Sequence, residues 1–361
     1  MAAASPGGRR SFAGNLVPAE PHGLRAADSR LFQKRLLFLV GKGGVGKTTL
    51  ATALALASAK QGKKTLLLEF DGNTRAARLL GLPPLDEPID IVRQVSPTLS
   101  VLSTTGQAAL DEYLRLIFPI KRLLRVVTES RVYQYFVAAA PGLKELLTMG
   151  KVWYEEHKRD SDTQEPLWDL LIADMPATGH SLQYLRMPQA ARDTFSTGLV
   201  QRESERVLTL FRDPEKTAIN LVTIPEELPT SETYEAYQQL TEKLEFPLGV
   251  LFINSVRQCP IPQSVLANAQ IRVRAPAQAR NLAEQVLTSA RAEAALAEAQ
   301  APYLQHLQKL PLPTVQVPFY FAEQFSLPEV EQIADLLTAV LEEGAKEEKK
   351  KGRKGRRSSR Q

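Results

Sequence analysis

Short apolar runs, each bounded by polar or turn residues, alternate with helical patterns along this 361-residue chain. Such runs are typical of buried strands in a parallel sheet whose connections are helices. The predicted strands are Leu36–Val40, Thr65–Phe70, Leu99–Ser103, Trp168–Ala173, Thr217–Thr223 and Leu248–Ile253. The pattern therefore predicts an α/β fold with a mostly parallel central sheet flanked by helices.

A helical insertion is predicted between residues 105 and about 160, where helical periodicity continues without an intervening strand. One face of this region is apolar, with Leu110 and Leu114 among its members, and a further helix is predicted over Lys144–Tyr154. An amphipathic face of this kind packs into the protein's own core or forms a groove for an apolar client helix. The pattern alone leaves both interpretations open.

A glycine-rich segment follows the first predicted strand and precedes a predicted helix. It consists of Gly41, Lys42, Gly43, Gly44, Val45, Gly46, Lys47, Thr48 and Thr49. Glycines allow the backbone to turn tightly and direct N–H groups at phosphate oxygens, and the positive end of the helix dipole adds to the attraction. Lys47 is placed to neutralise the outer phosphates and Thr48 to ligate Mg²⁺ through its hydroxyl. The segment predicts a loop that binds the phosphates of ATP, and its second lysine, Lys42, indicates a dimer.

A second phosphate-responsive segment is predicted at the end of the fourth strand. Its candidate switch residues are Asp174, Pro176, Thr178, Gly179 and His180. An aspartate at the carboxyl end of a buried strand can hold Mg²⁺ through a water molecule while the following loop senses the terminal phosphate. His180 also permits a metal-ligand or general-base interpretation. We favour a structural or switch role for it, because the chain has four histidines and no clustered ligands.

Charge divides the chain into a weakly acidic body and a basic tail. Residues 346–361 carry nine Lys and Arg against two Glu, so the overall net charge of +5 leaves about −2 for the remainder. The body is therefore not expected to bind specific DNA sequences. The tail is interpreted as a disordered, solubilising extension, with contact to an anionic membrane or RNA as the alternative.

The expected domain organisation has three parts. Residues 1–33 form a disordered N-terminal segment, residues 34–343 form the ATP-binding domain with its insertion, and residues 344–361 form the basic tail. The sequence has no apolar stretch of about 20 residues and no secretory signal pattern. A cytoplasmic protein, peripherally attached to a membrane if the tail binds lipid, is expected.

Three segments in this order resemble the ArsA-type ATPases. They are GKGGVGKTT at 41–49, DMPATGHSLQYLRMP at 174–188 and TIPEELPTSET at 223–233. That family includes the arsenite-pump ATPase and the guided-entry ATPase that targets tail-anchored membrane proteins. It belongs to the deviant Walker A group of P-loop proteins, together with MinD and ParA-like proteins.

The resemblance implies specific roles for several residues. Lys42 would reach the nucleotide of a partner subunit, and Asp71 would position or activate the attacking water. With Lys47, these residues form the implied catalytic set, and Mg²⁺ is the implied cofactor. The implied adenine-recognising residues are Asn254, Pro318 and Phe319.

Two departures from the family pattern affect its expected chemistry. The first switch usually reads Asp-Pro-Ala-His, whereas Asp71 is followed here by Gly-Asn-Thr, which predicts slow or differently coupled hydrolysis. The single cysteine, Cys259, cannot build the multi-cysteine metalloid site of the arsenite-stimulated members or the zinc clip of some targeting dimers.

Three functions remain as hypotheses from the sequence. The first is a dimeric ATPase, homodimeric or paired with a paralogous ATPase, that captures and releases a hydrophobic helix or membrane-protein client. The second is the energising subunit of an anion or metalloid efflux system. The third is a regulatory nucleotide switch that pairs with a paralogous ATPase at the membrane surface.

Overall fold

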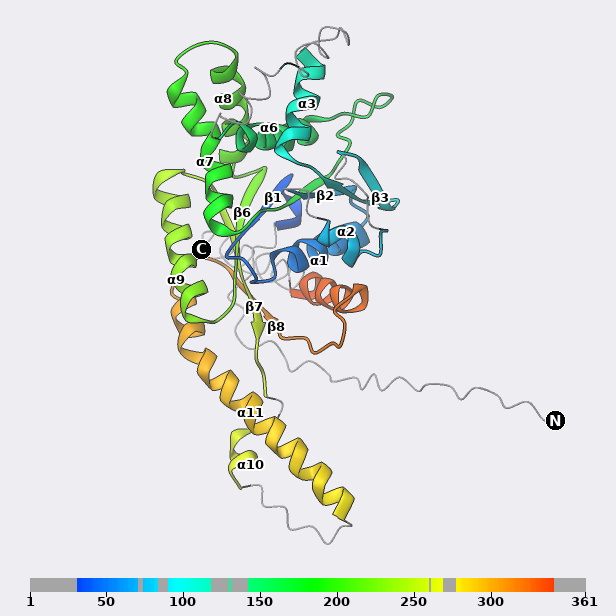
Figure 1. Cartoon of the computed structure of the whole chain (residues 1–361), viewed down its shortest axis with the longest axis vertical. Helices are drawn as coiled ribbons and strands as arrows, with labels where there is room; N and C mark the ends of the chain where they lie inside the picture. The colour runs from blue at the N-terminus through cyan, green and yellow to red at the C-terminus, as the bar shows by residue number, and fades with distance from the viewer. Residues whose placement is uncertain are drawn as a thin grey trace, which may run out of the picture.

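A single mixed sheet organises the molecule. The computed structural model describes residues 31–70, 74–83, 90–117, 130, 142–259, 261–268 and 277–340. Within these ranges eight strands pair in the order β3-β4-β2-β5-β1-β6-β7-β8 (Figure 1). Neighbouring strands are parallel throughout, except that β3 runs antiparallel to β4. The predicted α/β fold is confirmed.

The six predicted strands are all present, and two further strands lie at the sheet edges. The strands are β1 (Leu36–Val40), β2 (Thr65–Glu69), β3 (Val92–Ser96), β4 (Leu99–Ser103), β5 (Leu170–Asp174), β6 (Thr217–Thr223), β7 (Leu248–Val256) and β8 (Thr314–Pro318). Every residue of β1, β2, β4, β5 and β6 is buried, as expected of strands covered on both faces. The apolar pattern did not reveal β3, a partly exposed edge strand with only two apolar residues, or β8, which follows a proline-rich segment.

Helices cover both faces of the sheet. They are α1 (Lys47–Lys60), α2 (Arg75–Leu79), α3 (Gly106–Ile117), α6 (Leu143–His157), α7 (Thr178–Thr194), α8 (Leu199–Arg212), α9 (Glu227–Gln238), α10 (Gln263–Asn268) and α11 (Ala277–Leu307). Short helical turns η1 (Leu31–Gln33) and η2 (Gln239–Lys243) and a C-terminal helix over residues 327–340 complete the described elements.

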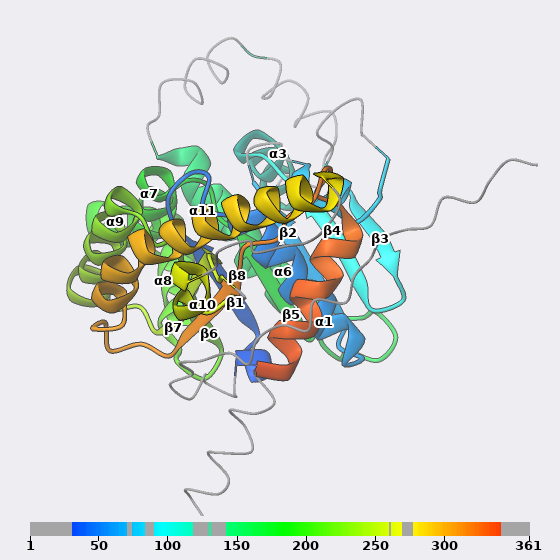
Figure 2. The ribbon, with the colours of Figure 1, turned by 90° about the horizontal axis from the view of Figure 1, so that it is seen from below.

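One core lies between the sheet and a layer formed by α1, α2 and the C-terminal helix. Helix α1 has buried Ala and Leu residues around its circumference, because it packs between the sheet and the C-terminal helix (Figure 2). Leu31 and Phe32 of η1 are also buried in this core. The folded body therefore includes residues 31–33, which the sequence interpretation assigned to the N-terminal segment.

The second core lies on the opposite face, beneath α6, α7, α8 and α9. Phe38 of β1 meets Phe211 of α8 edge-to-face, with ring centroids 4.9 Å apart. Helices α3 and α6 belong to the predicted insertion, and Leu110 of α3 is buried whereas Leu114 is half-buried. The remaining apolar positions expected in this region, residues 117–137, lie outside the side chains that the structure describes.

Helix α11, 31 residues long, extends away from the sheet together with α10 (Figure 1). Its first two dozen residues include no fully buried side chain among those described, whereas Leu307 at its end is buried in the second core. Nowhere in the described ranges is a helix long and apolar enough to cross a membrane.

Candidate functional site

The glycine-rich loop connects β1 to α1 in a conformation that depends on its glycines. Gly44 and Gly46 have φ angles of +87° and +91°, which residues with a Cβ rarely adopt. A Cβ on Gly46 would lie 2.2 Å from Nδ2 of Asn254, and one on Gly41 would lie 2.0 Å from the carbonyl oxygen of Val222. The loop therefore places bare backbone at the N-terminus of α1, where N–H groups are available to an anion.

Lys47 folds back over this loop. Its Nζ donates hydrogen bonds of 2.8 Å to the carbonyl oxygens of Gly41 and Lys42, and its side chain is largely buried. Burial lowers the pKa of Lys47, while the nearby Asp174 carboxylate opposes the shift. These carbonyl contacts hold the ammonium group at the loop, within reach of a phosphate bound there.

Thr48 and Asp174 meet at the base of the loop. The Thr48 hydroxyl donates a 2.6 Å hydrogen bond to Oδ2 of Asp174, which ends β5. Burial raises the pKa of Asp174 to about 6, although the Thr48 hydrogen bond and the charge of Lys47 lower it. The second oxygen, Oδ1, is buried and has no hydrogen-bond partner among the described residues. An unpaired carboxylate oxygen beside a hydroxyl fits Mg²⁺, which binds oxygen ligands and keeps several waters.

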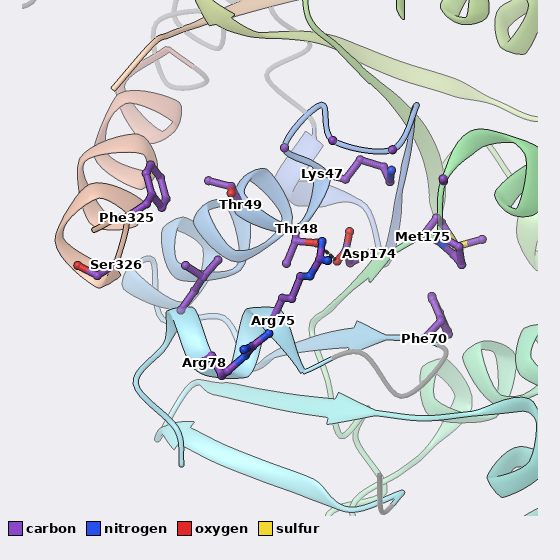
Figure 3. A pocket seen from close by; sticks show the side chains of 16 residues that line it. Lys47, Thr48, Thr49, Phe70, Arg75, Arg78, Asp174, Met175, Phe325 and Ser326 are labelled. Carbon is purple, nitrogen blue, oxygen red and sulfur yellow. Dashed lines mark hydrogen bonds between the residues drawn. The ribbon is translucent and has the colours of Figure 1, made fainter. Parts of the chain in front are cut away.

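These residues line a cavity of about 670 Å³ (Figure 3). The predicted residues in its wall are Gly43, Gly44, Gly46, Lys47, Thr48, Thr49, Asp174 and Pro176. Residues that the sequence interpretation missed are Phe70, Arg75, Arg78, Leu79, Met175, Ala177, Phe325 and Ser326. Arg75 and Arg78 lie three positions apart on α2, which follows the strand that leads to Asp71. This spacing at the carboxyl end of a strand was the sequence signal that could have identified them as residues of the cavity wall.

Lys42 is not among the cavity-lining residues. Its Nζ forms a 2.9 Å ion pair with Oε1 of Glu232 on α9, and both side chains are partly exposed. Val45, also in the loop, packs into the first core instead of facing the cavity. The structure thus assigns different surroundings to the two lysines of the loop.

The predicted switch segment begins at the cavity and continues as helix. Pro176 lines the cavity, whereas Gly179 and His180 are exposed in the first turn of α7. Thr178 is the first residue of α7, and its side chain lies outside the described ones. The His180 N–H donates to the carbonyl oxygen of Ala177. The segment expected to be a loop is therefore helical from Thr178 onwards.

The three implied adenine residues lie outside the cavity wall, and Asn254 alone of them is shown in contact with the glycine-rich loop. The Asn254 side chain donates a 2.9 Å hydrogen bond to the carbonyl oxygen of Val45. Pro318 pairs with Val256 of β7, and the Arg257 guanidinium stacks 3.6 Å from the ring centroid of Phe319. Asp71 lies outside the described residues.

Comparison with known proteins finds ATPases, which agrees with a glycine-rich loop placed to bind phosphate. Residues 34–204 match a family model described as anion-transporting ATPase. ATPase BagA of Mycobacterium tuberculosis is 35% identical over 228 residues, which is 63% of this chain and 66% of that protein. The arsenical pump-driving ATPase of Escherichia coli is 30% identical over 162 residues, covering 43% of this chain and 25% of that protein. ATPase ASNA1 homolog 2 of Paramecium tetraurelia is 24% identical over 280 residues, covering 66% of this chain and 80% of that protein.

The chain is similar to ATPases of the ArsA type. The region matched by the family model includes the phosphate loop, α2 and Asp174. The match to BagA, at 66%, covers slightly less than two thirds of that relative's length. The adenine positions at Asn254, Pro318 and Phe319 lie beyond residue 204.

The protein has a second cavity, an apolar groove of about 270 Å³ between α3, α6 and α8. Its apolar wall consists of Ala109, Leu143, Leu146, Leu147, Gly150, Trp153, Tyr154, Val200 and Val207. Lys151 lies at the groove and forms ion pairs of 3.1 Å with Asp90 and Glu155 and a further pair with Glu112. Burial lowers the pKa of Lys151, but these carboxylates raise it above its ordinary value overall. The groove is thus an apolar surface beside a compensated buried charge.

Proposed function

We propose that this protein binds Mg-ATP in the 670 Å³ cavity and hydrolyses it with water to ADP and phosphate. The observation that carries the proposal is the convergence of Lys47, Thr48 and Asp174 at one glycine-rich loop, with an unpaired Asp174 oxygen beside the Thr48 hydroxyl. Similarity to the ArsA-type ATPases supports the same activity.

The residues of this chain would mainly position the phosphates and neutralise their charge, as phosphoryl transfer requires. Lys47 would exchange its two carbonyl acceptors for the outer phosphate oxygens, while the loop N–H groups hold the phosphate chain. Thr48 would hold the metal directly and Asp174 through water; the bound Mg²⁺ supplies positive charge to the phosphates. Asp71 would orient the attacking water.

Turnover of the Asp71→Asn protein tests the hydrolytic part of the proposal. We expect ATP affinity close to that of the unsubstituted protein and a turnover reduced by about 100-fold, because a positioned carboxylate is lost. Asp335→Asn is a matched control, since Asp335 is an exposed partner of Lys60 at 2.6 Å. Phosphate release is measured for both variants, and unchanged turnover of Asp71→Asn contradicts the role of Asp71.

We also propose that ATP binding closes a dimer of two identical chains, or of this chain and a paralogous ATPase. Lys42 would leave Glu232 and reach the nucleotide of the partner subunit; its partly exposed ion pair makes this exchange inexpensive. Lys42→Ala should reduce ATP-dependent dimerisation in analytical ultracentrifugation, whereas Glu232→Gln should preserve it. A constitutive dimer that is unaffected by Lys42→Ala would contradict the proposal.

The groove between α3, α6 and α8 favours capture or release of a hydrophobic helix as the process coupled to ATP. Its half-buried Leu146, Leu147 and Trp153 offer an apolar surface in a helical region. No comparable feature in the described ranges favours an energising subunit of an efflux system or a regulatory switch at a membrane. The tail proposed to bind anionic lipid, residues 344–361, lies outside those ranges.

A labelled apolar helical peptide of about 20 residues tests this coupling. We expect its affinity for the protein to differ between ATP and ADP, because nucleotide-dependent closure would alter the groove. A hydrophilic helical peptide of equal length is the control. Equal affinity of the apolar peptide in both nucleotides would contradict coupling between the two cavities.

A further inference from the structure

Helix α2 is held against the end of β2 by a buried carboxylate. Glu69 accepts hydrogen bonds from the backbone N–H groups of Ala76 at 2.7 Å and Ala77 at 3.4 Å. It also accepts one of 3.0 Å from the hydroxyl of Ser103 on β4. These contacts fix the first turn of α2 to the sheet, and therefore fix the origin of the side chain of Arg75.

The Arg75 side chain extends from α2 toward the Thr48–Asp174 pair (Figure 3). Its positive charge acts on two members of the site, because it lowers the pKa of both Lys47 and Asp174. Arg78 lines the same cavity but has no such effect on either group. Of the two arginines on α2, Arg75 is therefore the one whose charge is placed at the metal and terminal-phosphate end of the cavity.

We propose that Arg75 binds the terminal phosphate of ATP from within the same chain. This inference rests on the proposed ATPase function. A phosphate held by Lys47 and the metal site of Thr48 and Asp174 lies between the loop and α2, in the part of the cavity that Arg75 enters. A guanidinium group presents paired N–H donors that match two phosphate oxygens. Before ATP binds, the same charge partly compensates the buried Asp174.

The chemical role of Arg75 is electrostatic. In hydrolysis the water oxygen forms a bond to the terminal phosphorus, and the bond from that phosphorus to the ADP oxygen breaks. Arg75 would stabilise charge on the oxygens that do not take part in either bond, and it would neither accept nor donate the transferred proton. Because Arg75 would contact the phosphate that ADP lacks, it should distinguish ATP from ADP.

Nucleotide affinity and turnover of the full chain test this assignment. Displacement of a fluorescent nucleotide gives the affinities for Mg-ATP and Mg-ADP of Arg75→Ala and Arg75→Lys. Arg75→Ala should weaken ATP binding about tenfold more than ADP binding and lower turnover by at least about tenfold. Arg75→Lys should recover part of both, because it keeps the charge but loses the paired donors. Arg192→Ala, which removes the partly exposed partner of the surface residue Asp193, is the control.

Added methylguanidine provides a readout that a merely structural role would not change. It should restore turnover to Arg75→Ala but not to Lys47→Ala. Arg75→Gln, which keeps a polar side chain, replaces the alanine variant if the latter does not fold. An unchanged ATP-to-ADP affinity ratio with unchanged turnover would overturn the role of Arg75, as would equal weakening of both nucleotides without rescue. Failure of the unsubstituted protein to bind ATP would instead refute the proposed function itself.

Discussion

The shape of the proposed nucleotide cavity and the shape of the apolar groove depend on different parts of the protein. The cavity depends on backbone geometry, because Gly44 and Gly46 adopt positive φ angles and Gly41 approaches the Val222 carbonyl. The groove depends on side chains that three helices present to one another. A backbone-defined site should lose function through single substitutions, whereas a side-chain groove should tolerate apolar exchange and respond mainly to added charge.

Helix α7 connects the two regions. It begins directly after the segment that carries Asp174 and Pro176, and it packs against both α6 and α8. Met187 of α7 lies against Gly142 at the start of α6, where a Cβ would come within 2.2 Å of the Met187 sulfur. A displacement of the segment after Asp174 therefore has a direct mechanical route to the groove, which supports the proposed coupling.

The largest expected effect is a loss of ATP binding that leaves peptide binding in the groove unchanged. Lys47→Ala removes the buried ammonium group that the outer phosphates require, so ATP affinity should fall by about 100-fold or more. Binding of an apolar peptide to the nucleotide-free protein should remain unchanged, because Lys47 does not line the groove. Titration calorimetry with each ligand provides the measurement. ATP affinity that stays within about threefold would show that the cavity is not a phosphate site.

The converse substitution should affect the groove alone. Leu146→Asp places a charge on the half-buried apolar wall and should weaken binding of the apolar peptide by about tenfold, with ATP affinity unchanged. Met149→Asp is the contrasting variant. Met149 is fully buried in the second core, so this substitution should unfold the protein. Thermal denaturation distinguishes them. Equal destabilisation by both substitutions would show that Leu146 is a core residue and not a binding surface.

A smaller effect concerns the carboxylate that holds α2. Burial raises the pKa of Glu69 from 4.5 to about 7, against the hydrogen bonds from Ala76 and Ser103, which lower it. The folded state therefore keeps this proton to higher pH than the unfolded state. The corresponding stabilisation is complete below pH 4.5 and is lost as the pH rises toward 7.

Glu69→Gln should remove this pH dependence, because the amide stays neutral and still offers an acceptor to α2. Relative to the glutamine variant, the unsubstituted protein should lose about 1–3 kcal/mol of unfolding free energy between pH 5 and pH 8. Denaturant unfolding across that range gives the difference. A constant difference at all pH values would mean that Glu69 titrates near its ordinary pKa. Glu329→Gln is the control, since Glu329 caps the C-terminal helix at the surface.

The fold was largely predictable because each strand corresponds to one continuous stretch of apolar residues in the sequence. The six predicted strands are uninterrupted apolar runs, and a parallel sheet buried on both faces requires such runs. The glycine-rich loop was predictable for the same reason, since Gly44, Gly46, Lys47 and Thr48 lie within one turn and the start of the helix that follows. Asp174 was predictable because it ends a buried strand at the edge where ligands of α/β sheets bind.

The missed features are contacts between residues far apart in the chain. Arg75 enters the cavity because Glu69 and Ser103 on neighbouring strands hold α2 in place. Phe325 reaches the same cavity from the segment before the C-terminal helix. The hydrophobic pattern could not distinguish Leu110, which is buried, from groove-lining residues of the same region, because both have the same periodicity.

The sequence by itself determined the order of strands and helices along the chain, the glycine-rich loop and the position of Asp174 at the end of a buried strand. Local periodicity and the conformational freedom of glycine encode these features within short segments. Only the tertiary structure decided that Lys42 pairs with Glu232, that Lys47 rests on the loop's own carbonyls, and that Arg75 faces Asp174. These outcomes depend on distances between elements, which packing of the two cores sets and which no local pattern specifies.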